Sequence, residues 1–131
     1  MEMFERLSAW RPQALAVLRI IAALLFIEHG TQKLFDFPAA EQPFGSLSGL
    51  MLVAALLEVV GGLAILVGFL TRPVAFVLSG FMAVAYFMAH APQDFFPVNN
   101  RGDAAILFCF VFLYLTAAGP GAWALDTRRK A

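Results

Sequence analysis

Long runs of hydrophobic residues alternate with short polar segments along the whole chain. The apolar runs cover residues 13–35, 47–70, 74–91 and 104–118, and proline, glycine and asparagine gather between them. A helix rises about 1.5 Å per residue and the hydrocarbon core of a bilayer is about 30 Å thick, so about 20 apolar residues can cross it. The pattern therefore predicts an all-α fold, an antiparallel bundle of four transmembrane helices.

The two ends of the chain differ from these runs. Residues 1–12 carry apolar side chains at helical spacing with charges between them, which predicts an amphipathic segment at the membrane interface. The apolar positions of this segment are Met3, Phe4, Leu7 and Trp10. Residues 13–121 are then the transmembrane domain, and residues 122–131 a basic tail.

Positive charge is distributed unevenly over the polar segments. One side of the predicted bundle would carry Arg6, Arg11, Arg72, Arg128, Arg129 and Lys130. The other side would carry Lys33 and Arg101. Because cytoplasmic segments are enriched in lysine and arginine, both termini are predicted to be cytoplasmic, in a multi-pass protein of the cell (inner) membrane.

Composition supports a lipid environment. Hydrophobic residues make up 61% of the chain and charged residues 14%, whereas soluble domains are about half apolar and a quarter charged. The net charge is zero, so no nucleic-acid partner is indicated. The single cysteine, Cys109, excludes an internal disulfide and a Cys-x-x-Cys redox pair. Redox chemistry would thus require a bound cofactor or a partner protein.

Several ionisable residues nevertheless lie within the apolar runs. A charged side chain at mid-bilayer costs at least ~2.5 kcal/mol, so such residues normally face the protein interior and pair. Glu58 shares its helix face with small residues that allow another helix to approach closely. These small residues are Ala54, Ala55, Gly61 and Gly62. His29 and Lys33 lie one turn apart, and we expect them to meet Glu58 or Asp103.

Other assignments stay open for the cations. Lys33 could instead extend to the outer interface, because a lysine stem can snorkel. Arg19 could pair with Glu58 and fix the helix register. Asp103 follows a loop rich in turn-forming residues, so it is also a candidate helix N-cap.

The two histidines raise the question of a cofactor. His29 and His90 lie toward the same predicted outer side and could ligate a haem axially, although hydrogen-bonded histidines of the bundle are the favoured assignment. A quinone suits the residue types better, because its head group accepts hydrogen bonds from histidine or glutamine. The predicted quinone-binding residues are His29, Gln32, Glu58 and His90. No metal site is predicted.

Two short patterns concern symmetry and assembly. His29-x-x-Gln32-x-x-Phe35 recurs as His90-x-x-Gln93-x-x-Phe96, which would fit a parallel repeat of two helices per half. Gly45-x-x-x-Gly49 and the face with Ser79 and Gly80 offer small-residue contacts for a homo-oligomer.

The chain resembles the DoxX family of small four-helix membrane proteins from Leu18 to Asp126. The residues that carry the resemblance are Leu18-Arg19-Ile20, His29-Gly30, Gln32-Lys33-Leu34-Phe35, Glu58, Gly61-Gly62, Gly68, Thr71-Arg72, Ala85-Tyr86-Phe87, His90, Phe96-Pro97, Asn100, Gly102-Asp103, Cys109-Phe110, Phe112-Leu113 and Gly119-Pro120-Gly121. Asp103 departs from the family, which usually has glutamate there, so the acid has a shorter reach.

The resemblance implies a function only in outline. The family is named for a membrane subunit of a thiosulfate:quinone oxidoreductase, and some relatives resemble membrane partners of redox or detoxification proteins. We therefore expect a subunit of a quinone-linked membrane redox system, with Glu58, His29, Lys33 and Asp103 as the catalytic residues. Whether the chain is an enzyme by itself is left open. The alternative is a non-catalytic membrane scaffold or small-molecule transporter whose buried charges are structural.

Overall fold

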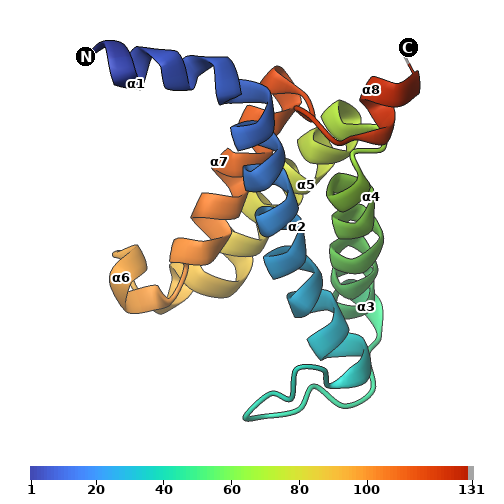
Figure 1. Ribbon diagram of the computed structural model, residues 1–131. Helices are drawn as coiled ribbons and strands as arrows, with labels where there is room; N and C mark the ends of the chain where they lie inside the picture. The colour runs from blue at the N-terminus through green and yellow to red at the C-terminus, as the bar shows by residue number, and fades with distance from the viewer. Residues whose placement is uncertain (130–131) are drawn as a thin grey trace. The chain divides into compact units, whose positions relative to one another are not determined.

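The computed structural model describes residues 1–129, and in this part of the chain all regular elements are helices, with no strands (Figure 1). The chain forms two compact units. One unit comprises Met1–Thr71 together with the C-terminal segment from Pro120, and the other is Arg72–Gly119. The all-α prediction is confirmed.

The first unit is built around one long helix. It contains α1 (Glu2–Arg6), the 3₁₀ turn η1 (Leu7–Trp10), α2 (Arg11–Phe35), α3 (Gly49–Leu56), the π-helical segment η2 (Leu57–Gly61), α4 (Gly62–Val67) and α8 (Leu125–Arg129). The N-terminal segment turns away from the axis of α2 (Figure 1). Pro12 lies in the first turn of α2, where its missing N–H costs no helical hydrogen bond. Asp36, in the left-handed conformation, ends that helix.

One face of α2 packs against the continuous helix formed by α3, η2 and α4. The buried residues of α2 recur every three or four positions: Ala16, Arg19, Ala22, Ala23, Phe26 and Gly30. A Cβ on Gly30 would lie 2.6 Å from Cγ2 of Val59 and 2.9 Å from the Ala55 carbonyl oxygen. A Cβ on Gly62 would lie 2.5 Å from Cγ1 of Ile27. The helices are therefore antiparallel and in close contact, as the small residues around Glu58 predicted.

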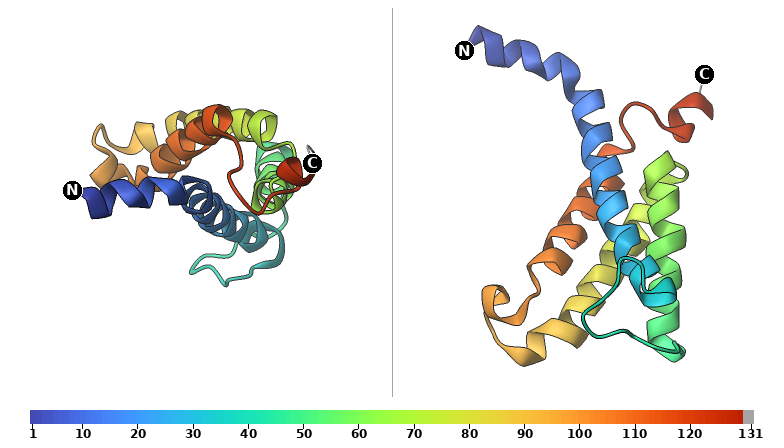
Figure 2. Two further views of the ribbon diagram at one scale, coloured as in Figure 1. Left: turned by 45° about the horizontal axis from the view of Figure 1, so that its top comes forward. Right: turned by 60° about the horizontal axis from the view of Figure 1, so that its bottom comes forward.

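The second unit is an antiparallel pair of helices. It contains α5 (Thr71–Ala85), the π-helical η3 (Tyr86–His90), the 3₁₀ turn η4 (Ala91–Gln93), α6 (Pro97–Asn100) and α7 (Asp103–Ala118). Helices α5 and α7 lie side by side (Figure 2). The Ser79 hydroxyl donates to the Cys109 carbonyl at 2.8 Å, and Arg72 donates to the carbonyls of Thr116 and Ala117.

Three of the helical segments are long and apolar enough to cross a membrane. They are Glu2–Phe35, Gly49–Val67 and Thr71–Gln93. The fourth predicted span, α7, is present as a shorter apolar helix of 16 residues. At about 1.5 Å per residue it is about 24 Å long, somewhat less than the hydrocarbon core.

The segments between the apolar runs are less simple than a loop between two spans. Thr71-Arg72-Pro73, which separates the second and third apolar runs, opens α5, and the turn lies at Gly68 and Leu70, both with positive φ. Residues 92–102 are not an uninterrupted loop, because they include α6.

Asp103 does not cap α7, because the N-cap residue is Gly102 and the aspartate is the first helical residue. The Gly45-x-x-x-Gly49 motif is not a helix face, because Gly45 precedes α3 and both glycines have positive φ. By contrast, α7 ends at Ala118, directly before Gly119-Pro120-Gly121, as predicted.

Candidate functional site

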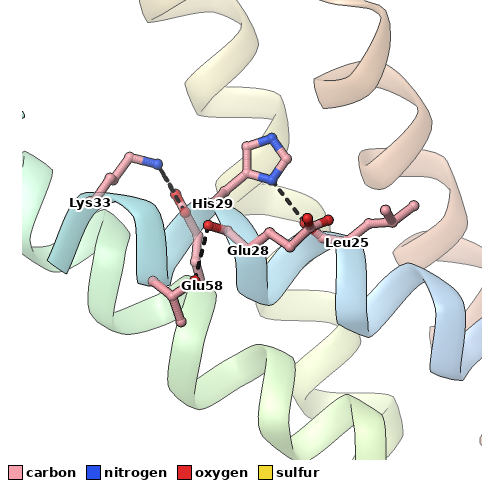
Figure 3. A network of polar contacts seen from close by, with 6 residues as sticks. Leu25, Glu28, His29, Lys33 and Glu58 are labelled. Carbon is pink, nitrogen blue, oxygen red and sulfur yellow. Dashed lines mark hydrogen bonds and ion pairs between the residues drawn. The ribbon is translucent and has the colours of Figure 1, made fainter. Parts of the chain in front are cut away.

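A buried ion pair joins the two packed helices of the first unit. Nζ of Lys33 on α2 lies 2.6 Å from Oε1 and 2.9 Å from Oε2 of Glu58 on η2 (Figure 3). The Glu58 side chain is 4% exposed and the Lys33 side chain 14%. Lys33 therefore does not extend to the interface. It turns toward the Glu58 carboxylate, one of the two partners that the sequence predicts. Both carboxylate oxygens accept a hydrogen bond from the ammonium. Such charge-assisted hydrogen bonds stabilise two opposite charges in an apolar environment.

Local backbone structure brings the two charges together. Gly30 lies one turn before Lys33, and the absence of a side chain there lets the backbone of α2 approach η2. Glu58 stands in a π-helical segment, where one extra residue per turn changes the direction of the side chains. Such segments within α-helices are frequent at functional sites.

His29 lies on the same face of α2 as Lys33, one turn earlier (Figure 3). Its Nδ1 is 2.9 Å from the Leu25 carbonyl oxygen, which fixes that nitrogen as the donor and leaves Nε2 as an acceptor in the neutral ring. The imidazole is close enough to Glu58 to interact with it electrostatically. His29, Lys33 and Glu58 thus form one cluster, which we call the α2–η2 cluster.

Gln32, which we predicted to bind a cofactor, contacts the loop after α2. Its Nε2 donates to the Pro38 carbonyl at 3.1 Å. The side chain therefore holds the start of the loop that follows α2.

His90 and Asp103 belong to the second unit. Nδ1 of His90 lies 2.9 Å from the Asn100 carbonyl oxygen, and its ring stacks on Tyr86. Asp103 is exposed at the start of α7. Among the described residues, no group of three or more His, Cys, Asp or Glu side chains is arranged to hold a metal ion.

The sequence reasoning missed the role of Asn100. This fully buried residue donates to the Tyr86 hydroxyl and to the Asp94 carbonyl, and its Oδ1 accepts from the Gly102 N–H at 2.8 Å. The only sequence signal for this buried side chain is that it lies in a string of turn-forming residues, Asn-Asn-Arg-Gly.

Arg19 has a role that differs from the expected one. It does not pair with Glu58. Its guanidinium donates instead to the backbone carbonyls of the C-terminal segment, at Pro120, Ala122 (3.0 Å) and Trp123 (2.8 Å). Arg19 is completely buried. Its guanidinium has five N–H donors and no acceptor, so it can donate to several carbonyls at once. The prediction that it pairs with Glu58 is wrong, because the guanidinium donates to these carbonyls instead.

The same C-terminal segment also holds the turn after α4. Asp126 accepts hydrogen bonds from the N–H groups of Leu70 and Thr71, both at 2.8 Å. Its own N–H donates to the Gly68 carbonyl at 2.9 Å. Residues 120–126 are therefore a structural part of the first unit.

Long apolar helices with an ion pair buried between two of them define an integral, multi-pass membrane protein. The chain belongs to the DoxX family: the family's model, described as DoxX, matches residues 14–91, more than half of the chain.

Three bacterial relatives match nearly their whole length. A protein of Haemophilus influenzae described as uncharacterized is 42% identical over 93% of this chain and 95% of its own. The inner membrane proteins YqjF and YphA of Escherichia coli are 34% and 30% identical. These alignments cover 84% and 92% of this chain, and 87% and 94% of the relatives. No solved structure matches the chain.

Proposed function

We propose that the protein is a membrane subunit of a quinone-linked redox system and that the α2–η2 cluster binds the quinone head group. The observation that supports this is the composition of the cluster. It joins a Lys33 ammonium and a Glu58 carboxylate, paired between two membrane-spanning helices, with an exposed imidazole on the same helix face as Lys33.

The donors and acceptors of the cluster fit a quinone. The Lys33 ammonium donates the hydrogen bond that a carbonyl oxygen of a quinone requires, and Nε2 of His29, an acceptor in the neutral ring, can accept from a hydroxyl group of the reduced head group. When bound, a quinone supplies two-electron chemistry coupled to the uptake of two protons. The Glu58 carboxylate can accept a proton and return it, whereas Lys33 holds the carboxylate in place. Electrons would come from a partner protein, since the single cysteine excludes an internal dithiol.

The orientation of the site follows the charge distribution. In the first unit, the N-terminal end of α2, the Gly68–Leu70 turn and α8 lie at one end, because Arg19 and Asp126 connect them. Arg6, Arg11 and Arg128 belong to this end, whereas the Arg129 side chain and Lys130 lie outside the described part of the chain. The positive-inside bias supports a cytoplasmic position for it. The α2–η2 cluster then faces the outer half of the bilayer, and α7 completes a four-helix bundle.

Quinone retention tests this function. The protein is purified gently from its own membrane, and bound quinone is quantified from the oxidised-minus-reduced ultraviolet spectrum. We expect quinone in the wild type and about a tenfold or greater loss of affinity in His29→Ala and Glu58→Gln, since a hydrogen bond to a charged group contributes about 1.5–3 kcal/mol. Glu28→Gln is the matched control, because Glu28 is an exposed carboxylate beside His29 on the same helix.

Circular dichroism of each variant establishes that it is folded. A folded wild type without any quinone signal, also after addition of a soluble ubiquinone analogue, would contradict the proposal. So would His29→Ala and Glu58→Gln variants that retain quinone as well as the wild type does.

The second candidate function is a non-catalytic scaffold or a small-molecule transporter. Arg19 favours it, because this equally buried charge contacts backbone carbonyls and fixes the C-terminal segment. In that case the Lys33–Glu58 pair would also serve only to fix the helices. Glu58→Gln would then lower the thermal stability in detergent, and no quinone-dependent property would change.

A further inference from the structure

An aromatic side chain from the loop after α2 lies beside the Lys33 ammonium of the α2–η2 cluster. Nζ of Lys33 lies 5.8 Å from the centroid of the Phe44 ring. This distance is within the range at which a cation is attracted to the face of an aromatic ring. Phe44 itself is 42% exposed, so part of its side chain remains accessible.

The loop is attached to α2 mainly through its first residues. Asp36 and Phe37 donate backbone hydrogen bonds to the carbonyls of Gln32 and Thr31, and Gln32 holds the Pro38 carbonyl. The Ala40 N–H donates to the Asp36 carboxylate at 3.0 Å. The hydrogen bonds within the described loop and between the loop and α2 all involve residues 36–40.

The part of the loop that carries Phe44 is held differently. Gly45 and Gly49 follow it with φ of +68° and +57°, a left-handed conformation that glycine adopts without steric cost. A Cβ at either glycine would meet nothing within 4 Å, so this stretch is loosely packed. The contact between the ring and the Lys33 ammonium brings this part of the loop to the ion pair.

We propose that Phe44 is a specificity-determining cover of the Lys33–Glu58 pair. Its ring closes over the Lys33 ammonium and offers an aromatic face on which a planar head group stacks when it contacts the cluster. The distance between Phe44 and Lys33 is the evidence that the ring covers the ammonium. The further role, stacking of a planar head group on the ring, depends on the proposed quinone function. Planar aromatic or quinonoid head groups are the ligand class that such a face selects.

Chemical labelling of Lys33 measures the covering role without any quinone. The chain has two lysines, Lys33 and Lys130, so Lys130→Arg leaves Lys33 as the only lysine side chain. The initial rate of acylation by an amine-reactive reagent is followed by peptide mass spectrometry in folded protein. We expect Phe44→Ala to raise this rate about two- to fivefold, the factor that corresponds to a cation–π contact at an exposed site.

Two further variants keep the test decisive. Phe37→Ala is the matched control, because Phe37 is a 73% exposed phenylalanine of the same loop. It should leave the rate unchanged. Phe44→Leu keeps an apolar side chain of similar size without the ring, and we expect an intermediate rate. An unchanged rate in both Phe44 variants, or an equal rise in Phe37→Ala, would overturn the covering role.

Adding a soluble ubiquinone analogue separates this inference from the proposed function. Protection of wild-type Lys33 by the analogue, reduced severalfold in Phe44→Ala, supports both. Faster labelling of Phe44→Ala with no protection by quinone supports the cover and contradicts the quinone function. Protection by quinone that is independent of Phe44 supports the quinone function and overturns the specificity role.

Discussion

The two ends of α2 each bury a cation, and the cations have different partners. Near its N-terminal end, Arg19 donates to backbone carbonyls of Ala122 and Trp123. Near its C-terminal end, Lys33 donates to the side chain of Glu58. A backbone carbonyl has one protonation state under physiological conditions, whereas a carboxylate can gain and lose a proton. The contact of Arg19 is therefore suited to holding structure, and that of Lys33 to chemistry as well.

The difference extends to the surroundings of the two cations. The Arg19 guanidinium is fully buried and connects α2 to a segment about a hundred residues later in the chain. The Lys33–Glu58 pair lies next to His29, at a π-helical segment and beneath a loop phenylalanine. Burial of a charge alone does not identify a functional residue in a membrane protein. The two positions differ in the hydrogen-bonded partner, which is a set of backbone carbonyls for Arg19 and a carboxylate for Lys33.

The largest expected effect is that of Arg19→Ala. It leaves the carbonyls of Pro120, Ala122 and Trp123 without their donor, and we expect a loss of roughly 3–5 kcal/mol of stability, or failure to accumulate folded protein. Thermal unfolding in detergent measures it. Arg11→Ala removes an exposed arginine from the same helix and should change the unfolding temperature little. Similar effects of the two variants would contradict the structural role of Arg19.

A smaller loss is expected for Glu58→Gln. The amide still accepts one hydrogen bond from Lys33 but leaves the buried ammonium without a counter-charge, at a cost of roughly 2–3 kcal/mol. The double variant Lys33→Met/Glu58→Gln removes that unpaired charge and should recover part of the loss. A double-mutant cycle on thermal stability measures the coupling. Additive effects would show that the two side chains are not coupled.

Gly30→Ala should perturb the pair indirectly. The added Cβ would lie 2.9 Å from both the Ala55 carbonyl oxygen and Cβ of Glu58, so the helices must separate, at a cost of about 1–3 kcal/mol. Gly80→Ala is the matched control, because a Cβ there meets nothing within 4 Å. It should be neutral or stabilising by up to about 1 kcal/mol, through helix propensity. Equal destabilisation by both variants would contradict the close approach of α2 and η2.

The sequence predicts much of this arrangement because hydrophobic length and small residues are local signals. Apolar runs interrupted by prolines and glycines locate the helices, and the small residues around Glu58 indicate that its face packs against another helix. The helical spacing of His29 and Lys33 places both on one face. These signals make Glu58 one of two predicted partners of Lys33, beside Asp103, and they do not exclude a lysine that extends to the interface.

The remaining contacts depend on the path of the chain, which periodicity does not specify. Nothing in the local sequence of Arg19 shows that carbonyls at residues 120–123 lie beside it. The π-helical segment at Glu58 arises from tertiary packing and leaves no spacing pattern. Gln32 and Asn100 bond to loop carbonyls, and Phe44 covers Lys33 through a loop whose course depends on positive φ at Gly45 and Gly49.

Infrared difference spectroscopy across quinone reduction tests the central claim most directly, because it observes the protonation of a carboxyl group. The purified protein with a soluble ubiquinone analogue is reduced electrochemically, and the reduced-minus-oxidised spectrum is recorded. If the α2–η2 cluster handles protons, a band of a carboxyl group that changes its protonation or its hydrogen bonding appears in the wild type and in Glu28→Gln, and is lost in Glu58→Gln. A spectrum without a carboxyl band in the wild type, or with a band that persists in Glu58→Gln, would contradict the account.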